Sequence, residues 1–309
     1  MTRPPLAALV GPTAAGKSRM GVEVALALGR CEIVSCDSMG VYRHLDIAAD
    51  KPSGDDRRGV PHHLFDVAEP TEDMTAVRYR TLARAAVDGI VARRRLPLLV
   101  GGSGLWFRAV TEDLEFAPTD PRVRARLSEE DPAVLWERLV AADPDAAARI
   151  DPRNPRRIVR AVEILELTGA PPSELRRTWE TFQGPYDLKV VALTWERGVL
   201  LERARERVHA ELAAGLLDEV RRVARDHGIS RTARQALGVK EMLEHIEGRL
   251  SLEEATELLV RNTKAFVRRQ ISWFRSDPRV EWIDASALGW DGARTAIVER
   301  FRPLLDVVG

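Results

Sequence analysis

Short apolar runs alternate with stretches of helical spacing along the N-terminal third of the chain. The runs cover residues 6–10, 32–36 and 96–100, and apolar side chains recur at helical spacing over 19–28 and 75–95. Strands and helices that alternate with short joins predict an α/β fold built on a doubly wound parallel sheet. Ligands of such sheets bind at the carboxyl ends of the strands, and these three runs end at Gly11, Asp37 and Gly101.

A proline-rich stretch interrupts this alternation between residues 116 and 186. Its pattern predicts short helices at 122–128, 133–142 and 156–168. An apolar run at 188–193 predicts a further strand, and the remaining pattern predicts helices at 198–227, 233–247 and 252–275. We therefore expect two domains. One is a core of 1–115 and 187–309 with a helical C-terminal region, and the other is a mostly helical insertion domain at 116–186.

The composition restricts how the chain can meet its partners. Its 309 residues contain 47 Lys and Arg against 47 Asp and Glu, so the formal net charge is zero. Binding of a nucleic acid would therefore depend on basic residues clustered on one part of the surface, because the net charge of the protein does not attract it. No apolar run approaches the roughly 18 residues of a membrane span. The two cysteines, Cys31 and Cys36, form no CxxC pair. We expect a cytoplasmic protein without a membrane segment.

The first strand leads into a complete phosphate-binding loop. The residues that match G-x-x-x-x-G-K-[ST] are Gly11, Pro12, Thr13, Ala14, Ala15, Gly16, Lys17 and Ser18. The glycines allow successive backbone N–H groups to face phosphate oxygens at a helix N-terminus. Lys17 adds a full positive charge, and the Ser18 hydroxyl can ligate Mg²⁺. Most such loops serve ATP or GTP, so a phosphotransferase is the first function to consider.

The other two strand ends carry polar side chains. Asp37 could hold Mg²⁺ through water, act as a general base, or cap the following turn. Ser103 offers a hydroxyl after a glycine pair, which by itself is a weak signal. For the adjacent His62 and His63 we favour hydrogen-bonding roles, since no third metal ligand is placed with them.

The motifs in their order resemble those of the tRNA dimethylallyltransferase family. They are GPTAAGKS, DSMGVYR, KP, PHHLFD, GGSGLWF, RRIVRAVEILELTG, QALGVKE and RRQISWFR, and they extend from about residue 6 to residue 275. The resemblance implies that N6 of adenosine 37, in the anticodon stem-loop of tRNA, attacks C1 of dimethylallyl diphosphate and that diphosphate leaves. It implies Mg²⁺ as cofactor, tRNA and dimethylallyl diphosphate as partners, and no membrane. The phosphate loop would then hold a leaving group, whose growing charge faces Lys17 and the loop amides.

The resemblance also assigns residues. It implies catalytic roles for Asp37 as the base, for Ser103 and Lys17 at the diphosphate, and for Arg124. The residues that it implies in tRNA binding are Asp37, Ser38, Met39, Gly40, Arg156, Arg157, Ile158, Val159, Arg160, Gln235, Ala236, Leu237, Gly238, Val239 and Lys240. The sequence departs from the family where a glutamine usually follows the base, since Met39 and Gly40 stand there. Ala49 likewise replaces a usual threonine.

Basic residues are sorted along two predicted helices. Arg261, Lys264, Arg268 and Arg275 fall on one helical stripe, which Asp277 alone accompanies, and a second cluster opens the helix at 156–168. Such sorting predicts contacts with a phosphate backbone, although a solvated face paired with distant acids is the alternative. By contrast, Arg203, Arg205 and Arg207 alternate with acids and are interpreted as ordinary surface pairs, as are Arg221 and Arg222. Trp273 and Phe274 are expected in the core.

The resemblance favours a prenyltransferase that acts on tRNA, and we expect it to be a monomer. A small-molecule kinase would use the same loop but has no need of the basic insertion. A prenyltransferase for free adenine nucleotide would turn over AMP without tRNA, and the predicted tRNA-binding blocks argue against it. A non-catalytic RNA-binding module would not need Lys17, Ser18 and Asp37 together.

Overall fold

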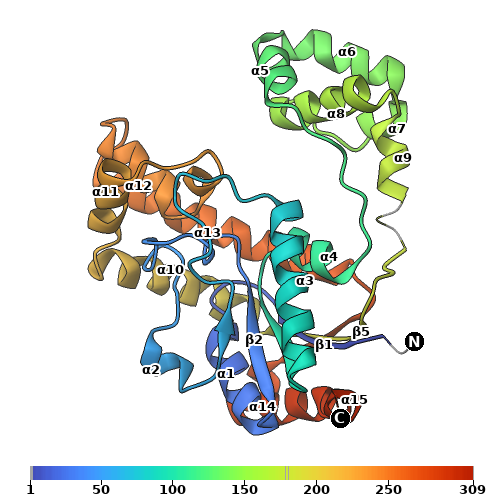
Figure 1. Cartoon of the computed structure of the whole chain (residues 1–309). Helices are drawn as coiled ribbons and strands as arrows, with labels where there is room; N and C mark the ends of the chain where they lie inside the picture. Colours follow the sequence, from blue (N-terminus) through green and yellow to red (C-terminus); the bar gives the residue numbers. More distant parts are fainter. Residues whose placement is uncertain (1–2, 178, 180, 309) are drawn as a thin grey trace. The chain divides into compact units, whose positions relative to one another are not determined.

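A computed structural model describes residues 3–177, 179 and 181–308, apart from the side chains of Arg176 and Arg177. Within this part the chain forms two compact units, which we treat separately (Figure 1). The sheet unit comprises Met1–Thr111 and Pro185–Gly309, and the helical unit comprises Glu112–Gly184. None of the described helices is both long enough and apolar enough to cross a membrane.

The sheet unit contains six parallel strands in the order β3-β2-β4-β1-β5-β6. The strands are β1 (Pro5–Val10), β2 (Cys31–Cys36), β3 (His62–His63), β4 (Leu96–Gly101), β5 (Asp187–Thr194) and β6 (Val280–Asp284). The predicted doubly wound parallel sheet is thus confirmed. Because β1 lies between β4 and β5, the loop that follows β1 is flanked by the ends of two neighbouring strands.

Helices cover both faces of the sheet. They are α1 (Lys17–Leu28), α2 (Gly54–Arg57), α3 (Ala76–Ala92), α4 (Gly104–Thr111), α10 (Arg197–Ala213), α11 (Leu216–Asp226), α12 (Val239–Ile246), α13 (Leu252–Arg275), α14 (Ala285–Phe301) and α15 (Pro303–Val308), with a 3₁₀ turn at Ala233–Gln235. Leu6, Ala8 and Val10 pack into a core with α3, α4 and α11–α13, whereas Ala7 and Leu9 pack into a second core with α1, α14 and α15. A strand buried on both faces requires the unbroken apolar run seen in the sequence.

Two predicted helices differ from the structure because of glycine. The stretch 198–227 forms two helices, since Gly215 adopts a left-handed φ of 100° between α10 and α11. The stretch 233–247 begins as a 3₁₀ turn and becomes helical only after Gly238, whose φ is 87°. The helix predicted at 252–275 is confirmed as α13. Strand β6 and helix α14 were not predicted, because β6 is short and only Ile283 in it is fully buried.

The helical unit contains α5 (Pro121–Glu129), α6 (Pro132–Ala142), α7 (Pro144–Ala147), α8 (Pro155–Thr168) and α9 (Pro172–Arg177). Asp120, Asp131 and Asn154 each accept a hydrogen bond from a first-turn backbone N–H, and proline follows each of them. A capping side chain followed by proline starts a helix efficiently, because proline lacks only an N–H that would remain unpaired there. Leu127, Leu135 and Ile158 contribute to a separate small core.

Candidate functional site

The phosphate loop lies between β1 and α1 and is pressed against the neighbouring strand. A Cβ atom on Gly11 would be 2.4 Å from the carbonyl oxygen of Leu193 in β5, so no other residue fits there. Ala14 and Gly16 both adopt left-handed backbone conformations, with φ of 63° and 84°. Left-handed residues next to right-handed ones turn successive N–H groups to one side, which forms a concave anion site. The loop therefore has the geometry that its sequence predicts.

Lys17 stands at the start of α1 with its ammonium turned back over the loop. Its Nζ donates a hydrogen bond of 2.7 Å to the carbonyl oxygen of Pro12. Burial lowers the pKa of Lys17 from 10.5 to about 8, and the nearby Asp37 carboxylate offsets part of this shift. A largely desolvated ammonium interacts strongly with an anion, because little water screens the charge.

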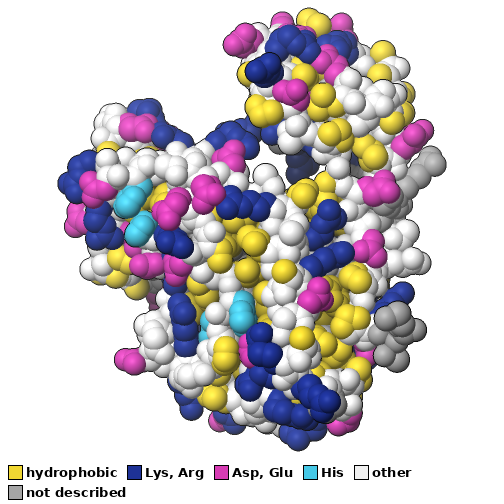
Figure 2. Space-filling model, viewed as in Figure 1, with side chains coloured by type: hydrophobic (Ala, Val, Ile, Leu, Met, Phe, Trp, Pro, Cys, Tyr) yellow, Lys and Arg dark blue, Asp and Glu magenta, His cyan; other side chains and the backbone are white. Residues whose placement is uncertain are grey.

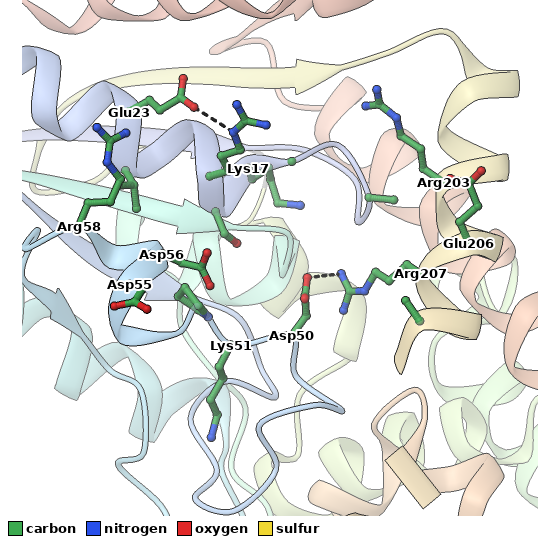
Figure 3. A pocket seen from close by; sticks show the side chains of 17 residues that line it. Lys17, Glu23, Asp50, Lys51, Asp55, Asp56, Arg58, Arg203, Glu206 and Arg207 are labelled. Atoms are coloured by element: carbon green, nitrogen blue, oxygen red, sulfur yellow. Dashed lines mark hydrogen bonds and ion pairs between the residues drawn. The ribbon is translucent and has the colours of Figure 1, made fainter. Parts of the chain in front are cut away.

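Arg207 on α10 completes the cationic side of this site. Its guanidinium donates 2.9 Å to the hydroxyl of Thr13 in the loop and pairs with Asp50 at 3.1 Å and with Glu211 at 2.6 Å. Figure 3 shows Arg207 and Asp50 joined on one side of the cavity, with Arg203 above them. The interpretation of Arg207 as an ordinary surface pair is therefore wrong. It pairs with Glu211 as expected, but its other contacts are with the phosphate loop and Asp50.

Two cavities meet at these residues. The larger, of about 730 Å³, is lined by Lys17, Ser18, Arg203 and Arg207 among others, and Lys51 also contributes to its wall. The ammonium of Lys51 points away from it (Figure 3) and binds Asp46, Asp66 and the Tyr42 carbonyl, so Lys51 holds its own loop together. The smaller cavity, of about 80 Å³, is lined by residues from all three strand ends: Lys17, Ser18, Asp37, Gly101, Gly102, Arg207 and Gln270, with Phe65 and Phe266 on its apolar side.

Asp37 follows β2 and faces the smaller cavity. Its Oδ1 accepts hydrogen bonds from the backbone N–H of Met39 at 2.8 Å and of Gly40 at 3.4 Å. One oxygen therefore caps the turn, while Oδ2 has no hydrogen bond to a described residue. Capping and a chemical role are thus compatible. Glycine at position 40 leaves room for Phe65, whose ring carbon would be 3.1 Å from a Cβ atom there.

The third strand end lies against the second. A Cβ atom on Gly101 would be 2.0 Å from the Cys36 carbonyl oxygen, and the N–H of Ser103 donates to that same oxygen at 3.3 Å. Ser103 is half-buried. Its backbone lies next to Cys36, the residue before Asp37. A parallel sheet predicts that the ends of neighbouring strands lie close together in this way.

Gln270 on α13 connects two of these loops, and no sequence pattern pointed specifically to it. Its Oε1 accepts 2.8 Å from the N–H of Thr13, and its Nε2 donates 2.9 Å to the carbonyl of Gly102. The side chain is buried, with 6% of its surface exposed. The only available signal was its position within the block RRQISWFR.

The described residues contain no group of three or more His, Cys, Asp or Glu side chains that could hold a metal ion. Ser18 is exposed beside Lys17 at the N-terminus of α1. The hydrogen-bonding roles expected of the histidines are confirmed. His63 bonds to Glu32 at 2.7 Å, and His62 bonds to the Val60 carbonyl at 2.8 Å.

The residues that the resemblance implies in tRNA binding fall on both units. In the sheet unit Ser38 and Met39 are half-buried beside Asp37, while Gly40 is buried. Of the second group, Gln235 and Lys240 are exposed and Leu237 is half-buried, whereas Ala236, Gly238 and Val239 are buried. Only Gln235 and Lys240 in this group therefore present polar side chains openly to solvent.

In the helical unit the predicted residues divide in the same way. Arg156 and Arg157 are exposed at the start of α8, but Ile158 and Val159 are buried in the core of the unit. The guanidinium of Arg160 donates to the backbone carbonyls of Ala117 and Pro118 and to Glu163. Arg124 lies in this unit too, on α5, where it binds Glu163 at 2.6 Å and Thr119 at 2.7 Å.

Glu163 holds these two arginines from inside the helical unit. Burial by itself raises the pKa of Glu163, but hydrogen bonds from Arg124, Arg160 and Thr119 outweigh that effect and lower the pKa to about 2. The carboxylate is fully buried and also accepts a hydrogen bond from the N–H of Asp120. It therefore joins the segment before α5 to α8.

The basic stripe on α13 is exposed to solvent. Arg261, Arg268 and Arg275 are exposed and Lys264 is half-buried, and none of the four has a described carboxylate within 4.0 Å. Asp277 pairs instead with Arg279. Phe274 is in the core as expected, but Trp273 is 39% exposed, so its prediction as a core residue is wrong. Elsewhere basic and acidic side chains are interspersed over the face shown in Figure 2, in keeping with the zero net charge.

Comparison with known proteins relates the chain to one family. Residues 40–277 match the family model described as IPP transferase. A tRNA dimethylallyltransferase from Salinispora tropica is 49% identical over 288 residues, which cover 91% of this chain and 88% of that relative.

Two solved structures also match. A tRNA isopentenylpyrophosphate transferase from Bacillus halodurans has a TM-score of 0.73 at 36% identity, covering 98% of this chain and 97% of its own. A eukaryotic dimethylallyltransferase acting on tRNA has a TM-score of 0.79 at 25% identity, covering 95% and 77%.

Proposed function

Since the chain belongs to the IPP transferase family, we propose that it transfers the dimethylallyl group of dimethylallyl diphosphate to N6 of adenosine 37 in the anticodon loop of tRNA. Diphosphate is released and N6-isopentenyladenosine is formed. The observation that carries this proposal is that the phosphate loop and Asp37 line one small cavity. An anion site and a carboxylate in contact with the same space suit a reaction in which a diphosphate leaves while an amine loses a proton.

In this proposal the phosphate loop binds the diphosphate of the prenyl donor. The left-handed residues Ala14 and Gly16 support an arrangement in which loop N–H groups bind the diphosphate. Lys17 and Arg207 add two positive charges at the same place, where burial limits screening by water. These charges stabilise the transition state more than the substrate, because negative charge grows on the diphosphate as the allylic C–O bond breaks.

Magnesium fits this site as a cofactor shared with the substrate. Mg²⁺ usually keeps several waters and takes one or two protein ligands together with phosphate oxygens. The exposed Ser18 hydroxyl at the N-terminus of α1 would be one such ligand. When bound, the metal would neutralise charge on the leaving diphosphate.

In this proposal Asp37 acts on the acceptor amine, and Ser103 lies beside it. The free Oδ2 of Asp37 is suited to take a proton from the N6 amine, while its Oδ1 keeps the carboxylate oriented through the Met39 amide. Ser103, beside the same strand end, is suited to contact the diphosphate. The adenine has to leave its stack to reach this cavity, which costs a few kcal/mol and is easiest in a loop.

Three exposed surfaces are suited to the tRNA backbone. They are the stripe on α13, the exposed Gln235 and Lys240, and the exposed start of α8 at Arg156 and Arg157. Ile158, Val159 and Arg160 would act by shaping that helix, because they are buried or bound to neighbouring groups. We also propose that Arg124 has a catalytic role and that residues 116–186 bind tRNA. We further propose that the protein is cytoplasmic and monomeric.

The test is to incubate the protein with unmodified tRNA, dimethylallyl diphosphate and Mg²⁺, and then to identify the nucleosides by mass spectrometry. We expect isopentenyladenosine at position 37. Parallel reactions with AMP as acceptor, and with γ-labelled ATP as donor, should give no product. A product from AMP without tRNA, or label transferred from ATP, would replace the proposal by the corresponding alternative.

The role of Asp37 is tested by Asp37→Asn, which preserves the cap to Met39 but cannot accept the proton. We expect turnover to fall by about a hundredfold or more with tRNA affinity unchanged. Asp88→Asn on α3 is the control, since Asp88 is exposed and lines neither cavity. Near-normal turnover of Asp37→Asn would exclude Asp37 as the base.

A further inference from the structure

A pair of stacked indoles lies behind the phosphate loop. Trp195 follows β5 directly, and Trp290 lies in α14 immediately after Gly289, where a φ of 69° breaks the helix. Their ring centroids are 6.5 Å apart with an angle of 20° between the planes. Neither residue belongs to the motifs that identify the family.

Both indoles touch the loop. The Nε1–H of Trp195 donates a hydrogen bond of 3.1 Å to the carbonyl oxygen of Ala15. The ring of Trp290 packs on Gly16, because a Cβ atom there would be 3.0 Å from its Cζ3. Trp290 is itself held by a hydrogen bond of 2.8 Å from its Nε1 to Glu23 on α1.

Two guanidinium groups enclose the stack. Arg203 lies over Trp195, 3.9 Å from the ring centroid, and Arg19 lies over Trp290 at 4.7 Å. A guanidinium over each indole adds a cation–π contact, which stabilises the observed ring positions. Trp195 therefore presents its N–H to the loop in one fixed direction.

The direction matters because Ala15 C=O and Gly16 N–H belong to one planar trans peptide. In such a peptide the carbonyl and the N–H point in opposite directions. A donor that fixes the Ala15 carbonyl on the outer side of the loop therefore fixes the Gly16 N–H on the concave side. The Gly16 N–H has no hydrogen bond to any described residue, so it is available to an anion.

We propose that Trp195 is a positioning residue of the phosphate loop, which holds the Ala15–Gly16 peptide in the orientation that binds the diphosphate. Trp290 supports it from behind and keeps Gly16 in place. The inference rests on the proposed function in taking the anion to be a diphosphate. It adds to that function a residue that contacts neither substrate nor metal and acts only through the backbone.

The test is the variant Trp195→Phe, which retains an aromatic ring for the stack and removes only the N–H donor. Trp282→Phe on β6 is the matched control, since Trp282 is half-buried and packs against the core on the other face of the sheet. We expect the Kd for Mg²⁺-pyrophosphate, measured by calorimetry, to rise about fivefold in Trp195→Phe, as the loss of one hydrogen bond predicts. The KM for dimethylallyl diphosphate should rise in parallel, while the KM for tRNA stays unchanged and the Tm falls by only about 2–4 °C, as the loss of one hydrogen bond predicts.

A Kd for pyrophosphate within twofold of the wild type would overturn the inference. A variant that loses affinity for pyrophosphate and for tRNA to the same extent, together with a large drop in Tm, would also overturn it. Such a result would indicate a general defect in folding. The pyrophosphate measurement needs no turnover, so it separates a failure of this inference from a failure of the proposed transferase activity.

A second measurement on the unaltered protein covers the case in which Trp195→Phe does not fold. The chain has seven tryptophans, so the indole N–H signals in a ¹⁵N–¹H spectrum are assigned by replacing each of the other six with Phe in turn, which leaves the Trp195 signal. The signals are then followed during titration with pyrophosphate. We expect the Trp195 signal to shift and that of Trp282 to remain. A Trp195 signal that does not respond would overturn the proposal.

Discussion

The guanidinium of Arg207 donates a hydrogen bond of 2.9 Å to the hydroxyl of Thr13 across 194 residues of sequence. The same guanidinium pairs with Asp50 and Glu211. The two carboxylates offset part of the positive charge, which lies next to the phosphate loop. Arg207 therefore joins α10, the loop after β1 and the segment that carries Asp50.

Replacing Arg207 by glutamine should impair use of the prenyl donor. Hydrogen bonds to charged groups contribute about 1.5–3 kcal/mol, so kcat/KM for dimethylallyl diphosphate should fall about tenfold to a hundredfold. Steady-state kinetics at saturating tRNA measure this. Arg205→Gln on the same helix is the control, because Arg205 is exposed and pairs only with Glu202. Equal kinetics in the two variants would mean that Arg207 acts only in the structure of α10.

Binding of diphosphate should weaken as the pH rises through about 8. Burial lowers the pKa of Lys17 to about 8, so its ammonium is present below that pH and is lost above it in the free protein. Calorimetric titration with Mg²⁺-pyrophosphate between pH 7 and 9.5 measures the effect. Pyrophosphate titrates too, so the reference is Lys17→Arg, whose guanidinium stays charged. The pyrophosphate affinity of the wild type divided by that of Lys17→Arg should fall above pH 8. A ratio that stays constant would mean that Lys17 does not lose its proton in this range.

The helical unit should depend on the buried charge of Glu163. Glu163→Gln leaves the guanidiniums of Arg124 and Arg160 without their shared carboxylate, and breaking such a pair costs about 3 kcal/mol or more. Urea denaturation followed by far-UV circular dichroism reports this. Glu137→Gln, an exposed neighbour on α6, should change nothing.

The same pair makes a pH prediction for stability. The pKa of Glu163 is lowered in the folded protein to about 2, so its contribution is complete above pH 4.5 and is lost as the pH falls toward 2. The difference in unfolding free energy between wild type and Glu163→Gln should shrink over that range. A difference that persists at pH 2 would mean that the carboxylate is not the stabilising group.

The basic stripe on α13 should govern the salt dependence of tRNA binding. Each phosphate contact contributes a slope of about 0.7–0.9 to the plot of log affinity against log salt concentration. The double variant Arg261→Gln, Arg268→Gln should therefore weaken binding and flatten that slope by about one to two. Filter binding at several salt concentrations measures both. Arg205→Gln with Arg225→Gln removes the same charge from paired surface positions and should leave the slope unchanged.

Local signals predicted the elements of this fold well, and contacts distant in sequence were the ones they missed. The Asp-Pro and Asn-Pro pairs start α5, α6 and α8 because cap and proline act within one turn. Arg207 was misinterpreted because Glu211, four residues on, makes the pattern of a surface pair. Its contact with Thr13 forms because β5 lies beside β1, which places α10, the helix that follows β5, next to the loop. Trp195 was missed for the same reason.

Helix α13 carries both the outward stripe of Arg261, Arg268 and Arg275 and the inward amide of Gln270. Gln270 contacts the phosphate loop at Thr13, so an RNA docked on the outward side of α13 would be separated from that loop only by the helix itself. If docking changes how Gln270 holds Thr13, tRNA alters the affinity for the donor, and thermodynamic linkage requires the donor to alter the affinity for tRNA by the same factor. The two substrates would then be cooperative ligands joined by a single glutamine.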